Sequence, residues 1–222
     1  MVLRRVVETR CGSTEAFERL FSVLGDDKKQ KLHFLYTDEH TSDAVETVTY
    51  AIEAANISGP IFIKDADNDF THAIVGGNYV THTSIVKEKV RPSFNGLNGN
   101  SNNNNFLRPD LVDAVKKSYV SFLYDNVVSN VAYGTFLSST FCCGGWGFLQ
   151  AKEFVKAAKT LRGLLRTSGL KKEAGSEAGE LRVMDVMWQL ICEGHLFFGL
   201  EVEDYRDWGS EAAWMATIKA SF

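Results

Sequence analysis

Hydrophobic and polar residues are arranged along the first 65 positions in a pattern that predicts alternating strands and helices. Apolar runs predict strands over residues 2–7, 32–36 and 61–63. Apolar positions spaced three and four apart predict amphipathic helices over residues 13–24 and 44–55. Because strands that alternate with helices pair through crossover connections, this half of the chain favours a parallel sheet covered by helices.

The rest of the chain predicts further strands, a hairpin and three helices. Strands are predicted over residues 78–86, 118–124, 127–133 and 195–202, with a strand, turn and strand over residues 136–148. Helices are predicted over residues 150–165, 181–192 and 211–220. A low-complexity, Asn-rich loop at residues 93–107 is expected to be mobile. The chain is therefore predicted to be a single α/β domain over residues 1–222, with one mixed, mainly parallel central sheet flanked by helices.

Composition and charge narrow the class of protein. Hydrophobic residues make up 45% of the chain, which is enough for a sizeable core. With 24 Lys and Arg against 28 Asp and Glu, the net charge is −4, so there is no basic field for nucleic acid or an anionic membrane. No apolar run is long enough for a signal peptide or a membrane span. The four cysteines lack metal-site spacing, and adjacent Cys142 and Cys143 are more typical of a core, so we expect an intracellular, cytoplasmic protein.

The clearest chemical signal follows the strand predicted over residues 61–63. Its polar residues are Lys64, Asp65, Asp67 and Asn68. Acids at the carboxyl end of a buried strand lie at the lip of a sheet, where open α/β sheets bind ligands. Carboxylates two residues apart can face one hard cation, which favours a metal and phosphate site. A solvated turn capped by the Asn68 side chain is the alternative that the residues leave open.

Three segments resemble one enzyme family. Residues 63–70, Ile-Lys-Asp-Ala-Asp-Asn-Asp-Phe, resemble the metal-binding turn of the sugar-phosphate nucleotidyltransferases, the NDP-sugar pyrophosphorylases. Residues 202–210, Val-Glu-Asp-Tyr-Arg-Asp-Trp-Gly-Ser, resemble the later Asp-x-Gly-Thr/Ser segment of that family, which supplies a second carboxylate to magnesium. Residues 141–148, Phe-Cys-Cys-Gly-Gly-Trp-Gly-Phe, resemble its Gly-Gly-aromatic strand beside the sugar. The three segments occur in the order that the family has.

The resemblance implies a Rossmann-like fold of the glycosyltransferase-A type, and it assigns roles to several residues. It implies a magnesium ion held by Asp67 and Asp207, with Asp65 as a second candidate ligand. Lys64 joins Asp67 and Asp207 as an implied catalytic residue, through a contact to phosphate. The implied substrate-binding residues are Asn68, Gly144, Gly145 and Trp146. The residues themselves leave other readings open: a surface lysine at 64, a bulge or tight bend at the two glycines, and a helix cap at Asp207.

The sequence departs from the family at three places. The family begins with a strand and a Gly-rich loop that wraps the triphosphate, whereas the first strand predicted here matches the family's second. Ala44 stands where the family has a Gln that helps to recognise the base, and Tyr133 stands where it has a Lys that contacts the sugar phosphate. The expected fold is therefore N-terminally truncated. Either the chain is a truncated or diverged relative, or the missing unit comes from another chain or an upstream gene segment.

The resemblance implies magnesium-dependent transfer of a nucleotide from an NTP to a sugar 1-phosphate or a small phospho-alcohol. A glycosyltransferase that uses a nucleotide-sugar is one alternative, for which Asp65 and Asp67 would form the metal motif. A non-catalytic nucleotide- or sugar-binding relative is another, and the three departures favour it. The implied partners are an NTP or nucleotide-sugar and a phosphorylated small molecule, with neither nucleic acid nor membrane. A homo-oligomer is left open.

Overall fold

The computed structural model describes six stretches of the chain, residues 2–4, 35–37, 40–73, 75–84, 117–167 and 179–207. The predicted helices over residues 13–24 and 211–220 and the Asn-rich loop at residues 93–107 lie outside the described residues. The chain divides into two compact units, Met1–Gly59 with Ala151–Val186 and Pro60–Gln150 with Met187–Phe222. The single domain over residues 1–222 stays a prediction.

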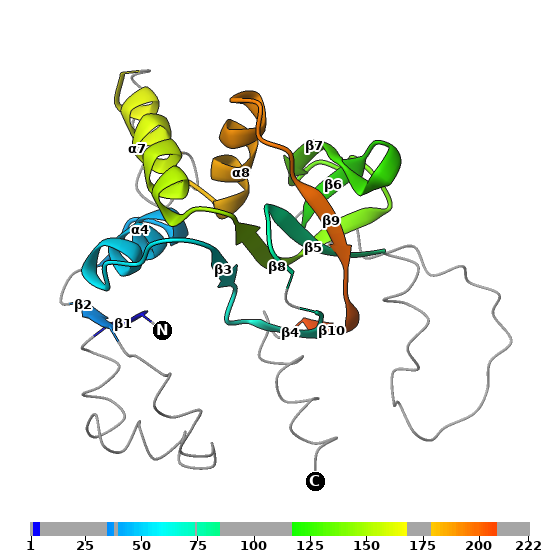
Figure 1. Ribbon diagram of the computed structural model, residues 1–222, viewed down its shortest axis with the longest axis horizontal. Coiled ribbons are helices and arrows are strands. Elements are labelled where there is room, and N and C mark those ends of the chain that lie inside the picture. Colours follow the sequence, from blue (N-terminus) through cyan, green and yellow to red (C-terminus); the bar gives the residue numbers. More distant parts are fainter. Residues whose placement is uncertain are drawn as a thin grey trace, which may run out of the picture. The chain divides into compact units, whose positions relative to one another are not determined.

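The first unit holds a pair of strands and two helices (Figure 1). β1 (Val2–Arg4) pairs in parallel with β2 (Leu35–Thr37), as the predicted β-α-β order requires. α4 (Ala44–Ala54) packs against α7 (Ala151–Thr167), and both agree with predicted helices. Their buried residues are Val45 and Ile52 on α4 and Ala151, Phe154, Ala157 and Ala158 on α7. A further helix, α8 (Val183–Cys192), begins in this unit and ends in the second.

Asp43, the N-cap of α4, joins three segments of the first unit. Its side chain is 2% exposed and makes two hydrogen bonds with the guanidinium of Arg162 on α7, at 2.7 and 2.9 Å. It also accepts from the backbone N–H of Glu46 at 2.9 Å and of Leu181 at 3.2 Å. Burial opposes the charge on Asp43, but these hydrogen bonds, that of Arg162 foremost, lower its pKa below the ordinary value.

The second unit is built on a six-stranded sheet with the strand order β7-β6-β8-β5-β9, and β3 also pairs with β8 (Figure 1). Its strands are β3 (Ile61–Lys64), β5 (Tyr79–Ser84), β6 (Ser118–Phe122), β7 (Val128–Tyr133), β8 (Thr140–Phe148) and β9 (Phe198–Glu201). β6 and β7 form the predicted hairpin, joined through η1 (Tyr124–Asn126), where Asp125 and Asn126 both have positive φ. Instead of the strand, turn and strand predicted over residues 136–148, β8 is one strand of nine residues.

The sheet is mixed, as predicted, but it is not mainly parallel. β8 is antiparallel to β3, β5 and β6, and β6 is antiparallel to β7. Within the described part of this sheet, only β5 and β9 pair in parallel. The length of the connection explains the antiparallel direction of β6 and β7. A three-residue turn such as η1 joins antiparallel neighbours, whereas parallel neighbours need a crossover of about a dozen residues or more.

A two-stranded ribbon completes the second unit. β4 (Asn68–Thr71) pairs antiparallel with β10 (Glu203–Asp207). Phe70 of β4 and Tyr205 of β10 belong to a buried cluster that also contains Tyr119, Phe141, Cys143 and Val202. The rings of Phe141 and Tyr205 meet edge to face, with their centroids 5.4 Å apart. This cluster therefore anchors the ribbon to β6 and β8 of the six-stranded sheet.

Two further features bear on the expectations from composition. Cys142 and Cys143 are buried, as expected of small core residues. None of the helices in the described stretches is both long and apolar enough to cross a membrane. The cytoplasmic location stays a prediction.

Candidate functional site

The acidic turn leaves β3 at a gap along one edge of β8. β5 pairs with β8 along residues 140–147 and occupies one edge of that strand. The other edge is shared, because β3 pairs with residues 145–148 and β6 pairs with Phe141. Between them, the N–H of Asp65 donates to the carbonyl oxygen of Gly144 at 2.8 Å. The turn over residues 65–67 therefore begins in a gap between two neighbouring strands.

Gly144 allows the side chains of this turn to lie directly on β8. Its φ is +76°, and a register shift of β8 against β5 falls at this point. A Cβ here would lie 2.4 Å from Nδ2 of Asn68 and 2.7 Å from Oδ2 of Asp65, so a side chain does not fit. At Gly145, a Cβ would lie 2.6 Å from Oγ1 of Thr81. The protein's own side chains fill the space beside both glycines, which agrees with the bend alternative. Their predicted contacts with a sugar stay predictions.

Asp65 is half-buried in the gap, and no described residue donates a hydrogen bond to its carboxylate. Burial raises the pKa of Asp65 to about 6, the charge of Asp67 adds to the rise, and the Lys64 ammonium opposes it. A carboxyl group whose pKa is raised this far by burial is typical of functional sites.

Lys64 stabilises the acidic turn through hydrogen bonds. Its ammonium donates to Oδ1 of Asn68 at 2.9 Å, to the carbonyl oxygen of Asp65 at 3.0 Å, and to the carbonyl oxygen of Asn68. It also lies 4.9 Å from the centroid of the Phe70 ring. These bonds engage the three donors of the ammonium group. The contact of Lys64 with phosphate stays a prediction, and it would require the turn to give up bonds that now hold it.

The pairing of β4 with β10 brings the second predicted carboxylate to this turn. Asp207 lies opposite Asn68, and Arg206 lies opposite Asp69. Residues directly opposite each other in an antiparallel pair share a face, so Asp207 and Asn68 lie on the same side of the ribbon. Asp67 immediately precedes Asn68 and is exposed. Two acids that are far apart in the sequence therefore lie at one end of the same ribbon.

Sequence reasoning missed Lys117, which precedes β6. Its ammonium forms an ion pair with Oδ2 of Asp207 and lies 3.3 Å from the hydroxyl of Tyr205. It also lies 5.0 Å from the centroid of the Phe141 ring and 5.4 Å from that of Tyr205. The available signal was the basic pair Lys116-Lys117 before a predicted strand, which is typical of an ordinary solvated surface.

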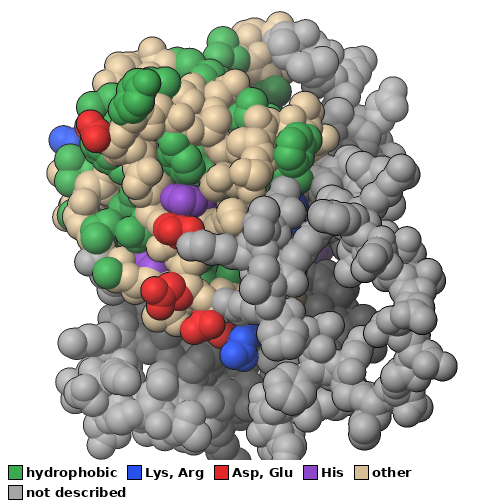
Figure 2. Space-filling model, turned by 90° about the vertical axis from the view of Figure 1, so that its right-hand side faces the viewer, with side chains coloured by type: hydrophobic (Ala, Val, Ile, Leu, Met, Phe, Trp, Pro, Cys, Tyr) green, Lys and Arg blue, Asp and Glu red, His purple; other side chains and the backbone are tan. Residues whose placement is uncertain are grey.

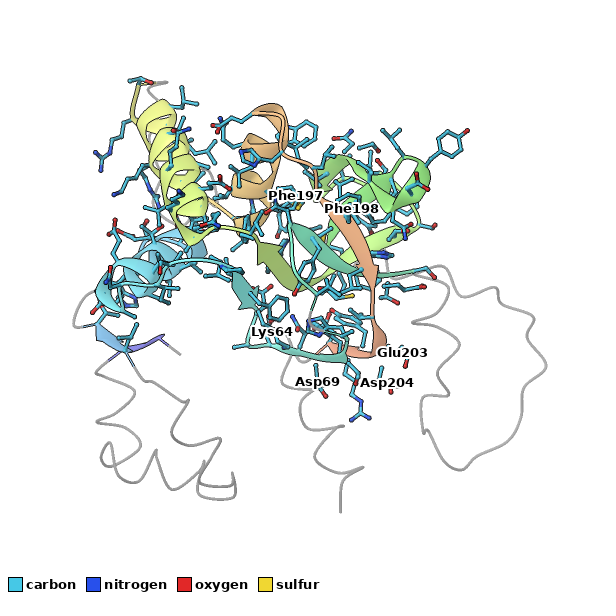
Figure 3. The ribbon with its side chains drawn as sticks, in the orientation of Figure 1. Lys64, Asp69, Phe197, Phe198, Glu203 and Asp204 are labelled. Carbon is cyan, nitrogen blue, oxygen red and sulfur yellow. The ribbon has the colours of Figure 1, made fainter. Side chains whose placement is uncertain are left out.

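The face of the ribbon opposite to Asn68 and Asp207 carries exposed charged side chains. Asp69 alternates with the buried Asn68 and Phe70 along β4 and is exposed. Figure 3 shows Asp69, Glu203 and Asp204 pointing away from the six-stranded sheet. Figure 2 looks onto the side of the protein where β9 lies in Figure 1 and shows acidic side chains gathered there. Asp69 therefore lies near Asp67 in the chain but on the face of the ribbon opposite to that of Asp207.

The carboxylates of Asp67 and Asp207 supply oxygen donors of the kind that suit a hard divalent cation. Mg²⁺ in proteins commonly uses one or two carboxylates and completes its shell with water and substrate phosphate, and Asp67 and Asp207 are such carboxylates. Asp207 already forms an ion pair with the ammonium of Lys117. No group of three or more His, Cys, Asp or Glu side chains in the described stretches is placed to hold a metal ion. The residues therefore fit a magnesium ion shared with a phosphate ligand better than a site made of protein alone.

Trp146 lies within the core. Its side chain is on β8, which pairs at this residue with Ile63 of β3 and Val80 of β5. Trp146 is 6% exposed, and its indole N–H has no hydrogen-bond partner among the described residues. Its predicted contact with substrate stays a prediction.

Comparison with known proteins identifies the fold. No protein-family model and no curated protein matches the sequence. The nucleoside-diphosphate-sugar pyrophosphorylase of Vibrio cholerae RC9 aligns with a TM-score of 0.63 and 14% identity, over 98% of this chain and 79% of that chain. The chain has a sugar-nucleotidyltransferase-like fold. The inositol-1-phosphate CTP transferase of T. maritima aligns with a TM-score of 0.56 and 12% identity, over 99% of this chain and 74% of that chain. The UTP-bound UGPase of Acinetobacter baumannii aligns with a TM-score of 0.52 and 10% identity, over 97% and 69%.

The fold implied by the three sequence motifs is thereby confirmed. In this nucleotidyltransferase-like fold, the motif at residues 63–70 spans the acidic turn between β3 and β4, and the motif at residues 141–148 lies in β8. The described part of the motif at residues 202–210 includes β10. At identities of 10–14% the likeness concerns the fold alone.

Proposed function

We propose that this chain transfers a nucleotide from an NTP to a sugar 1-phosphate or a small phospho-alcohol, with Mg²⁺ as the cofactor. The observation that carries the proposal is the antiparallel pairing that puts Asp207 opposite Asn68, directly after Asp67. The sequence motifs at these positions predict a shared metal ion, and the pairing brings Asp207 beside Asn68, the residue that follows Asp67 in the chain. The fold shared with an NDP-sugar pyrophosphorylase and a CTP transferase supports the same class of reaction.

In this reaction a phosphate oxygen of the acceptor attacks the α-phosphorus of the NTP in line. A new P–O bond forms, and the bond to the leaving pyrophosphate breaks. Catalysis depends mostly on positioning and on the neutralisation of phosphate charge, which bound magnesium supplies. Asp67 and Asp207 are the residues that would hold the ion, with Asp65 as a further candidate. Lys64 and Asn68 keep the acidic turn in shape through their hydrogen bonds.

A non-catalytic protein that binds a nucleotide or a sugar phosphate is the second candidate. The observation in its favour is that all three donors of the Lys64 ammonium are used within the turn. Lys64, the lysine nearest in sequence to the acids, therefore has a structural role in the turn. Ala44 and Tyr133 also lack the groups with which the family reads the base and holds the sugar phosphate.

The metal assignment is tested by calorimetry with Mn²⁺ and with Mg²⁺ on the full chain, in the presence and absence of a panel of NTPs. Asp67→Asn and Asp207→Asn should each weaken binding of the metal by about tenfold or more, or about 1.4 kcal/mol or more, because each removes a charged ligand. Asp69→Asn is the matched control, since Asp69 lies two residues after Asp67, on the exposed face of β4, and its effect should stay below about twofold.

Unchanged metal binding in both Asp67→Asn and Asp207→Asn would remove the assignment. Release of pyrophosphate from an NTP, dependent on an added sugar 1-phosphate, separates the two candidate functions. Metal and nucleotide binding without any release of pyrophosphate would favour the binding protein over the enzyme.

A further inference from the structure

Lys117 is a mostly buried cation that is bonded to a proposed metal ligand. Its side chain is 19% exposed, against 42% for Asp207. The ammonium lies between the ring faces of Phe141 and Tyr205 and the carboxylate of Asp207. Its backbone is held as well, because the carbonyl oxygen of Lys117 accepts a hydrogen bond from the N–H of Gly134 at 3.1 Å. The ammonium is therefore confined to a small region beside Asp207.

The ion pair of Lys117 and Asp207 conflicts with metal binding unless a second anion arrives. Among the described residues, Asp207 is the carboxylate to which the Lys117 ammonium is bonded. A divalent cation on Asp207 would take up the charge of that carboxylate and would place two further positive charges beside the ammonium. Because the metal would repel the ammonium and compete with it for the same carboxylate, Lys117 would oppose the metal until another anion replaced Asp207.

We propose that Lys117 couples the binding of the metal to the binding of phosphate. In the ligand-free protein its ammonium neutralises Asp207. When a divalent cation binds Asp207, the ammonium transfers to a phosphate oxygen of the substrate, so that each ligand favours the other. This inference rests on the proposed function, because it takes Asp207 as a metal ligand.

Lys117 suits this role better than Lys64 does. Lys64 uses its three donors on Asp65 and Asn68, and releasing them would undo the acidic turn. Lys117 exchanges one carboxylate for one phosphate oxygen, while the rings of Phe141 and Tyr205 continue to hold its position. The coupling thus requires a change of partner at a single ammonium group and no rearrangement of a strand.

The test compares Mn²⁺ affinity with and without glucose 1-phosphate, by calorimetry on the full chain. In the wild type, glucose 1-phosphate should raise the affinity for Mn²⁺ by about fivefold or more, the lower end of typical couplings. Lys117→Met should bind Mn²⁺ alone more tightly than the wild type, by about threefold or more, because the competing ammonium is gone. The same variant should lose the effect of glucose 1-phosphate, whereas Lys117→Arg should retain part of it.

The outcomes separate this inference from the proposed function. Wild-type binding of Mn²⁺ that depends on Asp207, together with unchanged Mn²⁺ affinity and coupling in Lys117→Met, overturns the role of Lys117 alone. Absence of Mn²⁺ binding, or binding unaffected by Asp207→Asn, overturns both proposals. Lys117→Gln, which keeps a hydrogen-bond donor for Asp207, is measured in parallel and provides the same test if the methionine variant does not fold.

Discussion

Replacement of Gly144 by alanine is expected to destabilise the second unit because two separate penalties meet at this residue. The backbone has φ of +76°, a left-handed conformation that costs a residue with a Cβ roughly 1–2 kcal/mol. The new Cβ would also lie 2.4 Å from Nδ2 of Asn68 and 2.7 Å from Oδ2 of Asp65. Both side chains would have to move, and Asn68 is only 6% exposed and accepts a hydrogen bond from Lys64.

Loss of that hydrogen bond adds about 1 kcal/mol, so the total for Gly144→Ala is about 2–3 kcal/mol. Urea unfolding, followed by tryptophan fluorescence, measures the change in the free energy of unfolding. Gly76→Ala is the control in the same unit, because a Cβ there meets no atom within 4 Å and its φ is not in the left-handed region. A loss of less than about 1 kcal/mol relative to Gly76→Ala would refute the view that the turn is packed onto Gly144.

Three more predictions concern the free energy of unfolding. The pKa of Asp65 rises from 3.8 to about 6 on folding, so the folded protein favours the protonated carboxyl group. The stability that this group contributes is therefore fully present below about pH 4 and is lost as the pH rises through 6. In metal-free buffer at pH 7.5, Asp65→Asn should therefore stabilise the protein by about 1–3 kcal/mol, and urea midpoints of both proteins that shift in parallel between pH 4 and 7 would contradict this. Asp43→Ala should cost about 2–4 kcal/mol by urea unfolding, because it removes the cap of α4 and leaves Arg162 without its carboxylate; a cost below about 0.5 kcal/mol would show that the pair is not needed. Gly163→Ala, inside α7 with no atom within 4 Å of the new Cβ, should stabilise by about 0.5–1 kcal/mol, and a raised unfolding midpoint is the check.

The local pattern of apolar and polar residues was sufficient to predict many of the helices and strands. The helices predicted over residues 44–55 and 150–165 match α4 and α7, because their apolar stripes are set by residue spacing alone. The hairpin at Asp125-Asn126 was equally visible, since both residues tolerate the positive φ that the turn uses. The acidic turn after residues 61–63 was found from the order of an apolar run and a polar cluster.

Strand direction and the partners of individual side chains were decided by the tertiary structure. An apolar run of four residues reads the same in a parallel and an antiparallel pair, so the sheet was expected to be mainly parallel although β8 is antiparallel to three neighbours. The ion pair of Lys117 with Asp207 depends on the pairing of β4 with β10 and on the cluster beneath it. Contacts of this kind join residues that no period along the chain relates. The sequence by itself therefore determined the elements and the candidate acids, and only the packing of the strands decided which charges meet.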